Sequence, residues 1–452
     1  MQDLTTGSLT RHLLKTTGFM LVTMATQTLY FLADIYWVGR LGREAVAAVG
    51  ISGNLLFVVL AVTQMLAVGA TTLISHAVGQ KDRDRALRIF NQAQVLSMLA
   101  GVVFLAAGMA VRLLYARAMS ADAATAALAS DYLLWYIPAS GLQFAMVAMA
   151  AALRGTGNFK PGMVVQTATV VINMVLAPIL IFGWGPQPPL GVAGAAISTL
   201  VAVVVGTVWL WTYFRSKDAY LRFQPSDWRP RLDLWGAMLR IGLPAGAEFG
   251  LLAIYMIIVY SVSRPFGAAA QAGFGIGMRI LQAGFMPVVA LGFAVAPVAG
   301  QNFGAGRYDR VRETFRAAAT MAVSLMIVLA ILCHIAPAAM VGVFSSDPAV
   351  IAVGDEYLRI ISWNFVASGV VFVASSTFQA IGNTLPSLAA SFVRILLVAA
   401  PVMALSRAAG FQLRWIWYIS VSAVAIQMAL SLWLLRREFA LRLVPAERGA
   451  PP

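Results

Sequence analysis

Residues 42–51 read GREAVAAVGI and residues 267–276 read GAAAQAGFGI, so a short pattern of glycine, alanine and isoleucine returns after 225 residues. Working outward at the same offset, residues 41–161 align with residues 266–386 without a gap, and 22 of these 121 positions are identical. That is about twice the number expected by chance for this composition. Eight identities fall on Gly, Asp, Asn and Pro, whereas coincidence would place matches on the abundant Ala, Leu and Val, so the pattern indicates an internal duplication.

The composition is that of a membrane protein. Of the 452 residues, 60% are hydrophobic and only 11% are charged, and the mean hydropathy is +0.81. A soluble domain has roughly a quarter charged residues, so the polar groups here are too few to cover a water-soluble globule. The charged residues lie in short clusters between long apolar runs, which is the pattern of membrane-spanning helices.

Twelve apolar runs of about 20 residues or more separate these clusters. They predict an all-α integral membrane protein with twelve transmembrane helices in two pseudo-symmetric six-helix bundles, related by an axis along the membrane normal. The first run is too long for a signal peptide and no cleavage site follows it, so we expect a retained span. The predicted spans are residues 13–38, 46–73, 90–112, 128–152, 162–183, 190–214, 237–263, 268–298, 315–343, 353–380, 385–407 and 413–435.

The basic residues predict the orientation. If alternate loops lie on opposite sides of the membrane, the side with both termini has 22 Lys and Arg residues and the other side has 8. The positive-inside rule then places both termini in the cytoplasm of a multi-pass protein of the cell membrane, the inner membrane in a Gram-negative organism. We expect an amino-terminal bundle over residues 1–214, a cytoplasmic linker over 215–236, a carboxy-terminal bundle over 237–440 and a cytoplasmic tail over 441–452.

Five segments carry a further pattern across the chain. They are DIYWVGRLG at 34–42, LRGTGN at 153–158, GVAGAAIST at 191–199, GQNFGAGR at 300–307, and Gly382-Asn383 followed by Pro386. Taken in this order, they resemble the multidrug and toxic compound extrusion (MATE) family of cation-coupled exporters. The resemblance implies efflux of varied, often cationic small molecules by alternating access, driven by inward flow of protons or sodium ions. It implies no cofactor beyond the coupling ion, and we expect a monomer.

Of 18 carboxylates, only Asp34 and Glu248 lie more than three residues inside a predicted span, where an uncompensated charge costs several kcal/mol. Asp34 lies six residues before Arg40 and could pair with it, or it could bind a cation. The first helix of the family carries an aspartate at this place as the coupling carboxylate. The resemblance therefore implies that Asp34 binds both the coupling ion and the substrate.

The fifth span departs from the family, whose helix commonly reads Asn, three residues, Asp, Pro. Here the segment reads Asn173, three residues, Ala177, Pro178, so the second acid is missing. Asn173 and Thr199 remain as neutral oxygen donors that could complete an ion-coupling site with Asp34. A single protonatable aspartate that binds a proton and the substrate in turn fits this inventory better than a two-carboxylate sodium site.

Three further residues are candidates for substrate binding. Gln27 precedes Asp34 on the same predicted helix and could face the same cavity or form an interhelical hydrogen bond. Glu248 lies about two turns into the seventh span, and could bind substrate or pair with Arg279 or Arg394. Arg279 could contact an anionic substrate group, or serve in that ion pair.

Several classes of function are excluded. The sequence has no HExxH motif, phosphate-binding loop or paired intramembrane aspartates, so we expect neither an enzyme nor a nucleotide-driven pump. The one cysteine, Cys333, allows no intrachain disulfide and no thiol metal site, and we expect no metal. The net charge of +14 is spread over helix ends and not over one basic face, which argues against nucleic-acid binding. The remaining alternative is a flippase or exporter of lipid-linked or other amphiphilic molecules.

Overall fold

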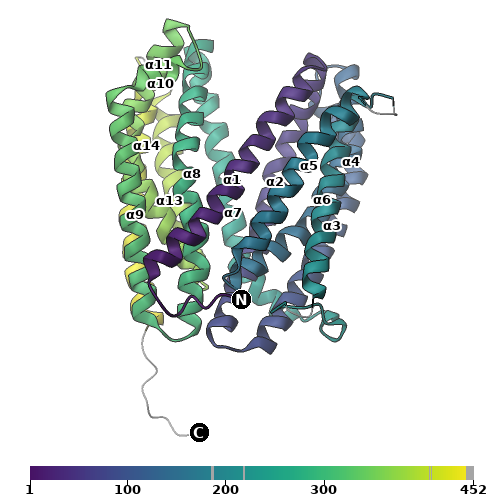
Figure 1. The fold of residues 1–452 in the computed structure, drawn as a ribbon. Coiled ribbons are helices and arrows are strands. Elements are labelled where there is room, and N and C mark those ends of the chain that lie inside the picture. The colour runs from purple at the N-terminus through teal and green to yellow at the C-terminus, as the bar shows by residue number, and fades with distance from the viewer. Residues whose placement is uncertain (185–187, 217–218, 407, 409, 444–452) are drawn as a thin grey trace. The chain divides into compact units, whose positions relative to one another are not determined.

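The computed structural model describes residues 1–184, 188–216, 219–406, 408 and 410–443, and all regular elements over these ranges are helices (Figure 1). The predicted tail residues 444–452, and Lys217, Arg407 and Arg448 among the basic residues counted for orientation, lie outside the described residues. The first half contains α1 (Leu9–Gly39), α2 (Arg43–Gly79), α3 (Arg83–Met119), α4 (Ala123–Gly155), α5 (Phe159–Phe182) and α6 (Gly191–Arg215). The second half contains η1 (Pro225–Trp228), α7 (Leu232–Ser263), η2 (Arg264–Phe266), α8 (Ala268–Gly304), α9 (Tyr308–Ile335), α10 (Pro337–Gly342), α11 (Pro348–Ile361), α12 (Asn364–Ala380), α13 (Leu385–Leu405) and α14 (Leu413–Arg442).

The number of membrane spans agrees with the prediction. In the described ranges eleven helices are long and apolar enough to cross a membrane, and there are twelve if the bent pair α11 and α12 counts as one span. Several helices extend beyond the apolar runs that predicted them, because their outer turns are polar. For example, α3 begins at Arg83 and not near residue 90, and Asp82 caps it by accepting a hydrogen bond from the backbone N–H of Arg85.

The helix boundaries repeat at the offset of the sequence duplication. Both ends of α2 and α8 differ by 225 residues, and so do the starts of α3 and α9 and the starts of α4 and α11. The turn after α2 also repeats, because Lys81 and its counterpart Gly306 both adopt the left-handed conformation, with φ of 59° and 68°. Unrelated helices would not share both boundaries and turn conformation, so the structure supports the duplication.

The two halves differ at the fourth span. In the first half α4 is continuous although it contains Pro138. In the second half α11 and α12 are separate helices that meet at an angle of 57°, with the break at Ser362 and Trp363. Trp363 is the counterpart of Pro138 at the 225-residue offset, so the bend does not depend on proline.

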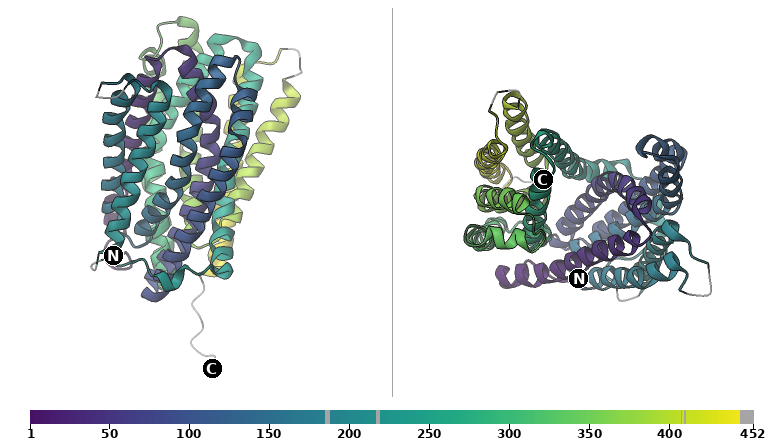
Figure 2. Two further views of the ribbon diagram at one scale, coloured as in Figure 1. Left: turned by 90° about the vertical axis from the view of Figure 1, so that its right-hand side faces the viewer. Right: turned by 90° about the horizontal axis from the view of Figure 1, so that it is seen from above.

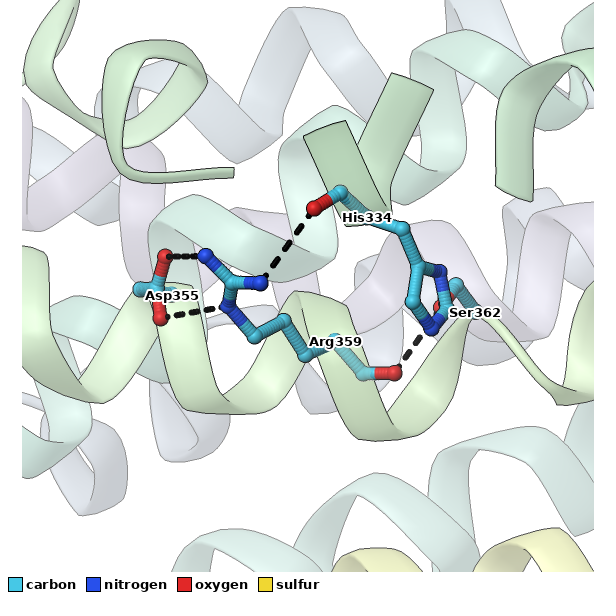
Figure 3. A network of polar contacts seen from close by, with 4 residues as sticks. All are labelled: His334, Asp355, Arg359 and Ser362. Atoms are coloured by element: carbon cyan, nitrogen blue, oxygen red, sulfur yellow. Dashed lines mark hydrogen bonds and ion pairs between the residues drawn. The ribbon is translucent and has the colours of Figure 1, made fainter. Parts of the chain in front are cut away.

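Polar contacts with α9 hold this bend (Figure 3). Arg359 of α11 pairs with Asp355 at 2.9 Å and donates a hydrogen bond to the backbone carbonyl of His334 at 3.2 Å. The Ser362 hydroxyl lies 3.1 Å from His334 Nδ1. These contacts satisfy polar groups at the break, which an unbroken helix would not need.

The chain forms two compact units. The first unit comprises Met1–Asp3 and Gly18–Gly246, and the second comprises Leu4–Thr17 and the chain from Ala247 onward. Both α1 and α7 therefore contribute residues to both units. Within each unit most helices run side by side, so that the view from above looks along their axes (Figure 2).

The linker belongs to the first unit because α3 binds its backbone. The Asn91 side-chain oxygen Oδ1 accepts hydrogen bonds from the Gln224 backbone N–H at 3.0 Å and the Trp228 indole N–H at 3.1 Å. The neighbouring Gln92 accepts one from the Arg231 amide at 2.9 Å. The part of this segment from Gln224 to Arg231 is thus fixed to the first unit and is not a free tether.

Glycines allow helices of the first unit to approach closely. A Cβ atom on Gly69 of α2 would lie 2.5 Å from the backbone carbonyl oxygen of Met238 in α7. A Cβ atom on Gly246 of α7 would lie 2.6 Å from the carbonyl oxygen of Ala61 in α2. Small residues that bring helix backbones together are a common means of packing in membranes.

Candidate functional site

A cavity of about 410 Å³ lies within the first unit, lined by residues of α1, α2, α4, α5 and α6. Pockets for small molecules have volumes of roughly 300–1,000 Å³, so this one can hold a drug-sized compound. Most of its lining is apolar or aromatic. Its polar lining includes Gln27, Tyr30, Asp34, Gln166, Asn173 and Thr199.

Asp34 lines this cavity from α1, and its side chain is only half-buried. It forms no ion pair with Arg40 among the described residues. The Arg40 guanidinium instead donates a hydrogen bond to the Tyr36 hydroxyl at 2.6 Å and lies over the Tyr36 and Trp37 rings. Asp34 therefore faces the cavity and is not paired with Arg40.

Asn173 and Thr199 meet across α5 and α6 beside this carboxylate. The Asn173 amide donates hydrogen bonds to the Thr199 hydroxyl at 3.1 Å and the Ser198 hydroxyl at 3.2 Å. The Tyr30 hydroxyl lies 3.2 Å from the Thr199 hydroxyl. Tyr30 precedes Asp34 by one helical turn, so the network reaches the same face of α1 as the carboxylate.

Gln27 lies on this face as well, and Gln166 of α5 donates a hydrogen bond to its side-chain oxygen at 3.0 Å. The structure thus places all four residues predicted for the first half, Gln27, Asp34, Asn173 and Thr199, around one cavity. Gln27 also forms the interhelical hydrogen bond that was the alternative interpretation, so the two roles coexist.

Four residues that were not predicted as site residues also line the cavity: Tyr30, Gln166, Tyr132 and Tyr136. Tyr132 and Tyr136 stack with ring centroids 5.3 Å apart. Aromatic rings attract organic cations through their electron-rich faces. Helical spacing from Asp34 could have indicated Tyr30, whereas nothing in a single apolar helix distinguishes a cavity tyrosine from a packing one.

Ala177, where the family often has an aspartate, does not line the cavity. It is 1% exposed and packs in an apolar cluster with Val38, Ile181 and Val192. The missing acid is therefore replaced by apolar packing, and no other carboxylate lines the cavity within the described residues.

Glu248 belongs to the second unit and lines no part of this cavity. The Ser387 hydroxyl donates a hydrogen bond to the Ser375 hydroxyl at 2.7 Å, and both serines lie against the Glu248 carboxylate. Arg394 is the cation that acts on Glu248 electrostatically, although no ion pair joins the two in the described part of the chain. Arg279 also lies in the second unit and is exposed. The predicted substrate-binding set is thus not assembled in a single cavity of the first unit.

Comparison with known proteins identifies the chain. The model of the MatE family matches residues 20–179 and 244–405. The chain belongs to the MatE family. It is therefore a multi-pass membrane transporter and not an enzyme.

Relatives in this family match over nearly their full length. The probable multidrug resistance protein YoeA of Bacillus subtilis is 28% identical over 416 residues, which cover 91% of this MatE chain and 90% of the relative. The FAD transporter of Shewanella oneidensis is 25% identical over 381 residues and 83% of each chain. The solved structure of a MOP superfamily transporter from Pyrococcus furiosus has the same fold, with a TM-score of 0.88 and 24% identity over 97% of each chain.

Proposed function

We propose that this MatE transporter exports small cationic or amphipathic compounds in exchange for protons that flow inward. The supporting observation is the charge inventory of the cavity, whose lining contains one carboxylate, Asp34, among neutral polar groups and aromatic rings over the described residues. Relatives that match over nearly the whole chain are named as multidrug resistance proteins. We expect the chain to act as a monomer in the cell membrane with both termini in the cytoplasm.

The exchange follows from the cost of an isolated charge. An ionised carboxylate in a largely apolar cavity is unfavourable unless a cation accompanies it. Asp34 can satisfy this requirement either by taking up a proton or by binding a cationic substrate, and one carboxylate cannot do both. Proton entry on the outer side therefore favours substrate release, and proton loss on the cytoplasmic side favours substrate binding.

The proton is favoured over sodium as the coupling ion because of the missing acid. Hard cations are held by several oxygen ligands at once. In this cavity Asn173 directs its amide N–H groups, which are donors, at Thr199 and Ser198, and Ala177 supplies no oxygen. A proton needs only one carboxylate oxygen, which Asp34 provides.

Ethidium efflux from proteoliposomes tests this proposal. Wild-type protein, Asp34→Asn and Asp131→Asn would be compared under an imposed proton gradient and then under an imposed sodium gradient. Asp131 is the matched control because it lies on α4, is exposed, and does not line the cavity. We expect proton-driven efflux in wild type and Asp131→Asn and none in Asp34→Asn. Efflux under sodium alone, or in Asp34→Asn, would overturn the proposal.

An exporter of amphiphilic molecules with anionic groups is the second candidate. It is favoured by a relative named as a FAD transporter, since FAD is an anionic dinucleotide, and by Arg394, which has no carboxylate partner in an ion pair among the described residues. In the same vesicles this candidate predicts efflux of anionic dyes and no dependence on Asp34.

A further inference from the structure

The second unit contains a counterpart of the cavity network of the first. At the 225-residue offset, Tyr30 of α1 aligns with Tyr255 of α7. Each tyrosine hydroxyl meets a hydroxyl on the last helix of its half: Tyr30 lies 3.2 Å from Thr199 of α6, and Tyr255 lies 3.3 Å from Ser420 of α14. The duplication has therefore kept a tyrosine contact between equivalent helices.

The charge in the two networks is opposite. The counterpart of Asp34 is Val259, which is fully buried in the apolar core of the second unit. In its place Arg394 of α13 lies over the Tyr255 ring, with the guanidinium carbon 5.6 Å from the ring centroid. The first network is thus centred on a carboxylate and the second on a guanidinium.

The Arg394 guanidinium has a hydrogen-bond donor that is not used. Its Nε–H is buried without a hydrogen-bond acceptor. Glu248, the acid that acts on it, instead lies against Ser375 and Ser387 and forms no ion pair with it in the part of the chain that the structure describes. A buried donor without a partner is costly in a membrane protein, which indicates that another molecule accepts this hydrogen bond.

Two amide side chains next to this network are incompletely satisfied in the same way. Asn364 is 5% exposed and donates a hydrogen bond to the Ser420 hydroxyl at 3.5 Å, but its carbonyl oxygen has no partner. Gln427 is 2% exposed and donates to Ser391, and its carbonyl oxygen also has no partner. The region therefore has an unused donor at Arg394 and unused acceptors at these two amides.

We propose that Arg394, Tyr255 and Ser420 form a subsite in the second unit for an anionic group, a carboxylate or a phosphate. A guanidinium matches the two oxygens of such a group with parallel hydrogen bonds, and nearby hydroxyls add further donors. The unpaired oxygens of Asn364 and Gln427 accept hydrogen bonds from N–H or O–H groups of the same ligand. The subsite adds a preference for anions to the proposed preference for cations. Transport of the bound anion rests on the proposed function, whereas its binding does not.

Binding of two dyes that share a ring system but differ in charge tests the subsite. Fluorescein is anionic and rhodamine 6G is cationic at neutral pH, and fluorescence polarisation reports the binding of each to the purified full-length protein. We expect Arg394→Gln to weaken fluorescein binding by about tenfold or more, as for loss of a charged hydrogen bond, and to change rhodamine 6G binding less than about twofold. Glu248→Gln should strengthen fluorescein binding, because it removes a competing negative charge. Arg316→Gln is the control, since Arg316 is an exposed residue of the second unit outside this network.

The outcomes separate the subsite from the proposed function. Loss of rhodamine 6G binding in Asp34→Asn reports on the first-unit cavity, whatever fluorescein does. If Arg394→Gln does not fold, Arg394→Lys keeps the charge but loses the paired donors, and should still weaken fluorescein binding. Competition by benzoate or phenyl phosphate distinguishes the carboxylate from the phosphate. Absence of fluorescein binding to wild type, equal binding to the Arg394 variants, or competition by neither compound would overturn the subsite.

Discussion

The substitution Gly69→Ala tests the close packing of α2 against α7. Its Cβ atom would lie 2.5 Å from the carbonyl oxygen of Met238 and 3.1 Å from that residue's Cα and carbonyl carbon, whereas ordinary contacts begin at 3.4 Å. These are backbone atoms, so no side-chain rotation relieves the overlap, and the helices must separate by about 0.9 Å. Overpacking of this kind lowers the free energy of unfolding by about 1–3 kcal/mol. The greater helix preference of alanine over glycine raises it by less than about 1 kcal/mol.

The assay is denaturation of the purified protein in mixed micelles, followed by tryptophan fluorescence. We expect Gly69→Ala to lower the free energy of unfolding by about 1–2 kcal/mol, the overpacking cost less the helix preference of alanine. The control is Gly236→Ala in α7, since a Cβ atom there meets nothing within 4 Å. It should be neutral or slightly stabilising. Wild-type stability in Gly69→Ala, or an equal loss in both variants, would refute the close-packing argument.

Two other substitutions address the cavity and a helix end. Tyr30→Phe removes the hydroxyl contact with Thr199, and should reduce the proton-driven efflux rate about two- to tenfold, as expected for one neutral hydrogen bond; a complete loss, or no change in initial rates, would contradict this. Asp122 caps α4 by accepting a hydrogen bond from the Thr125 amide at 2.7 Å, which lowers the pKa of its carboxyl. This contribution to stability is present above the ordinary aspartate pKa of about 3.9 and is lost as the pH falls through the lowered value. Asp122→Ala should therefore lower the denaturation midpoint at pH 7 but not at a pH well below the lowered pKa, and an equal effect at both pH values would exclude the ionised cap.

Hydropathy predicted the spans because each crosses the same apolar solvent, but it could not predict the shapes of the helices. The bend between α11 and α12 lies at Trp363, whereas Pro138, which is the residue that sequence rules associate with kinks, lies within a continuous helix. Beside the bend, Arg359 and Ser362 contact His334 of α9. Such contacts depend on the tertiary arrangement and leave no local signal.

The site was predictable where a residue is chemically costly in a membrane. Asp34 was found by its charge, and Asn173 and Thr199 by the resemblance to the family; all three line the cavity. Tyr30 and Gln166 were missed because tyrosine and glutamine are also ordinary packing residues in membrane helices.

The unit boundary could not be predicted, because the basic and proline-containing stretch before α7 has the composition of a flexible linker. The structure shows that Asn91 and Gln92 hold this stretch through its backbone. Backbone hydrogen bonds of this kind are independent of the sequence of the bound segment, so composition gives no sign of them.

The division of α1 and α7 between units bears on how the duplicated chain arose. In each half the first helix begins in one unit and ends in the other, at Thr17 and Gly18 in α1 and at Gly246 and Ala247 in α7. A half-length ancestor with this arrangement could not have completed either unit alone. It would have worked as a domain-swapped homodimer that exchanged the first parts of these helices, and gene fusion would then have converted an association that depended on concentration into a permanent one.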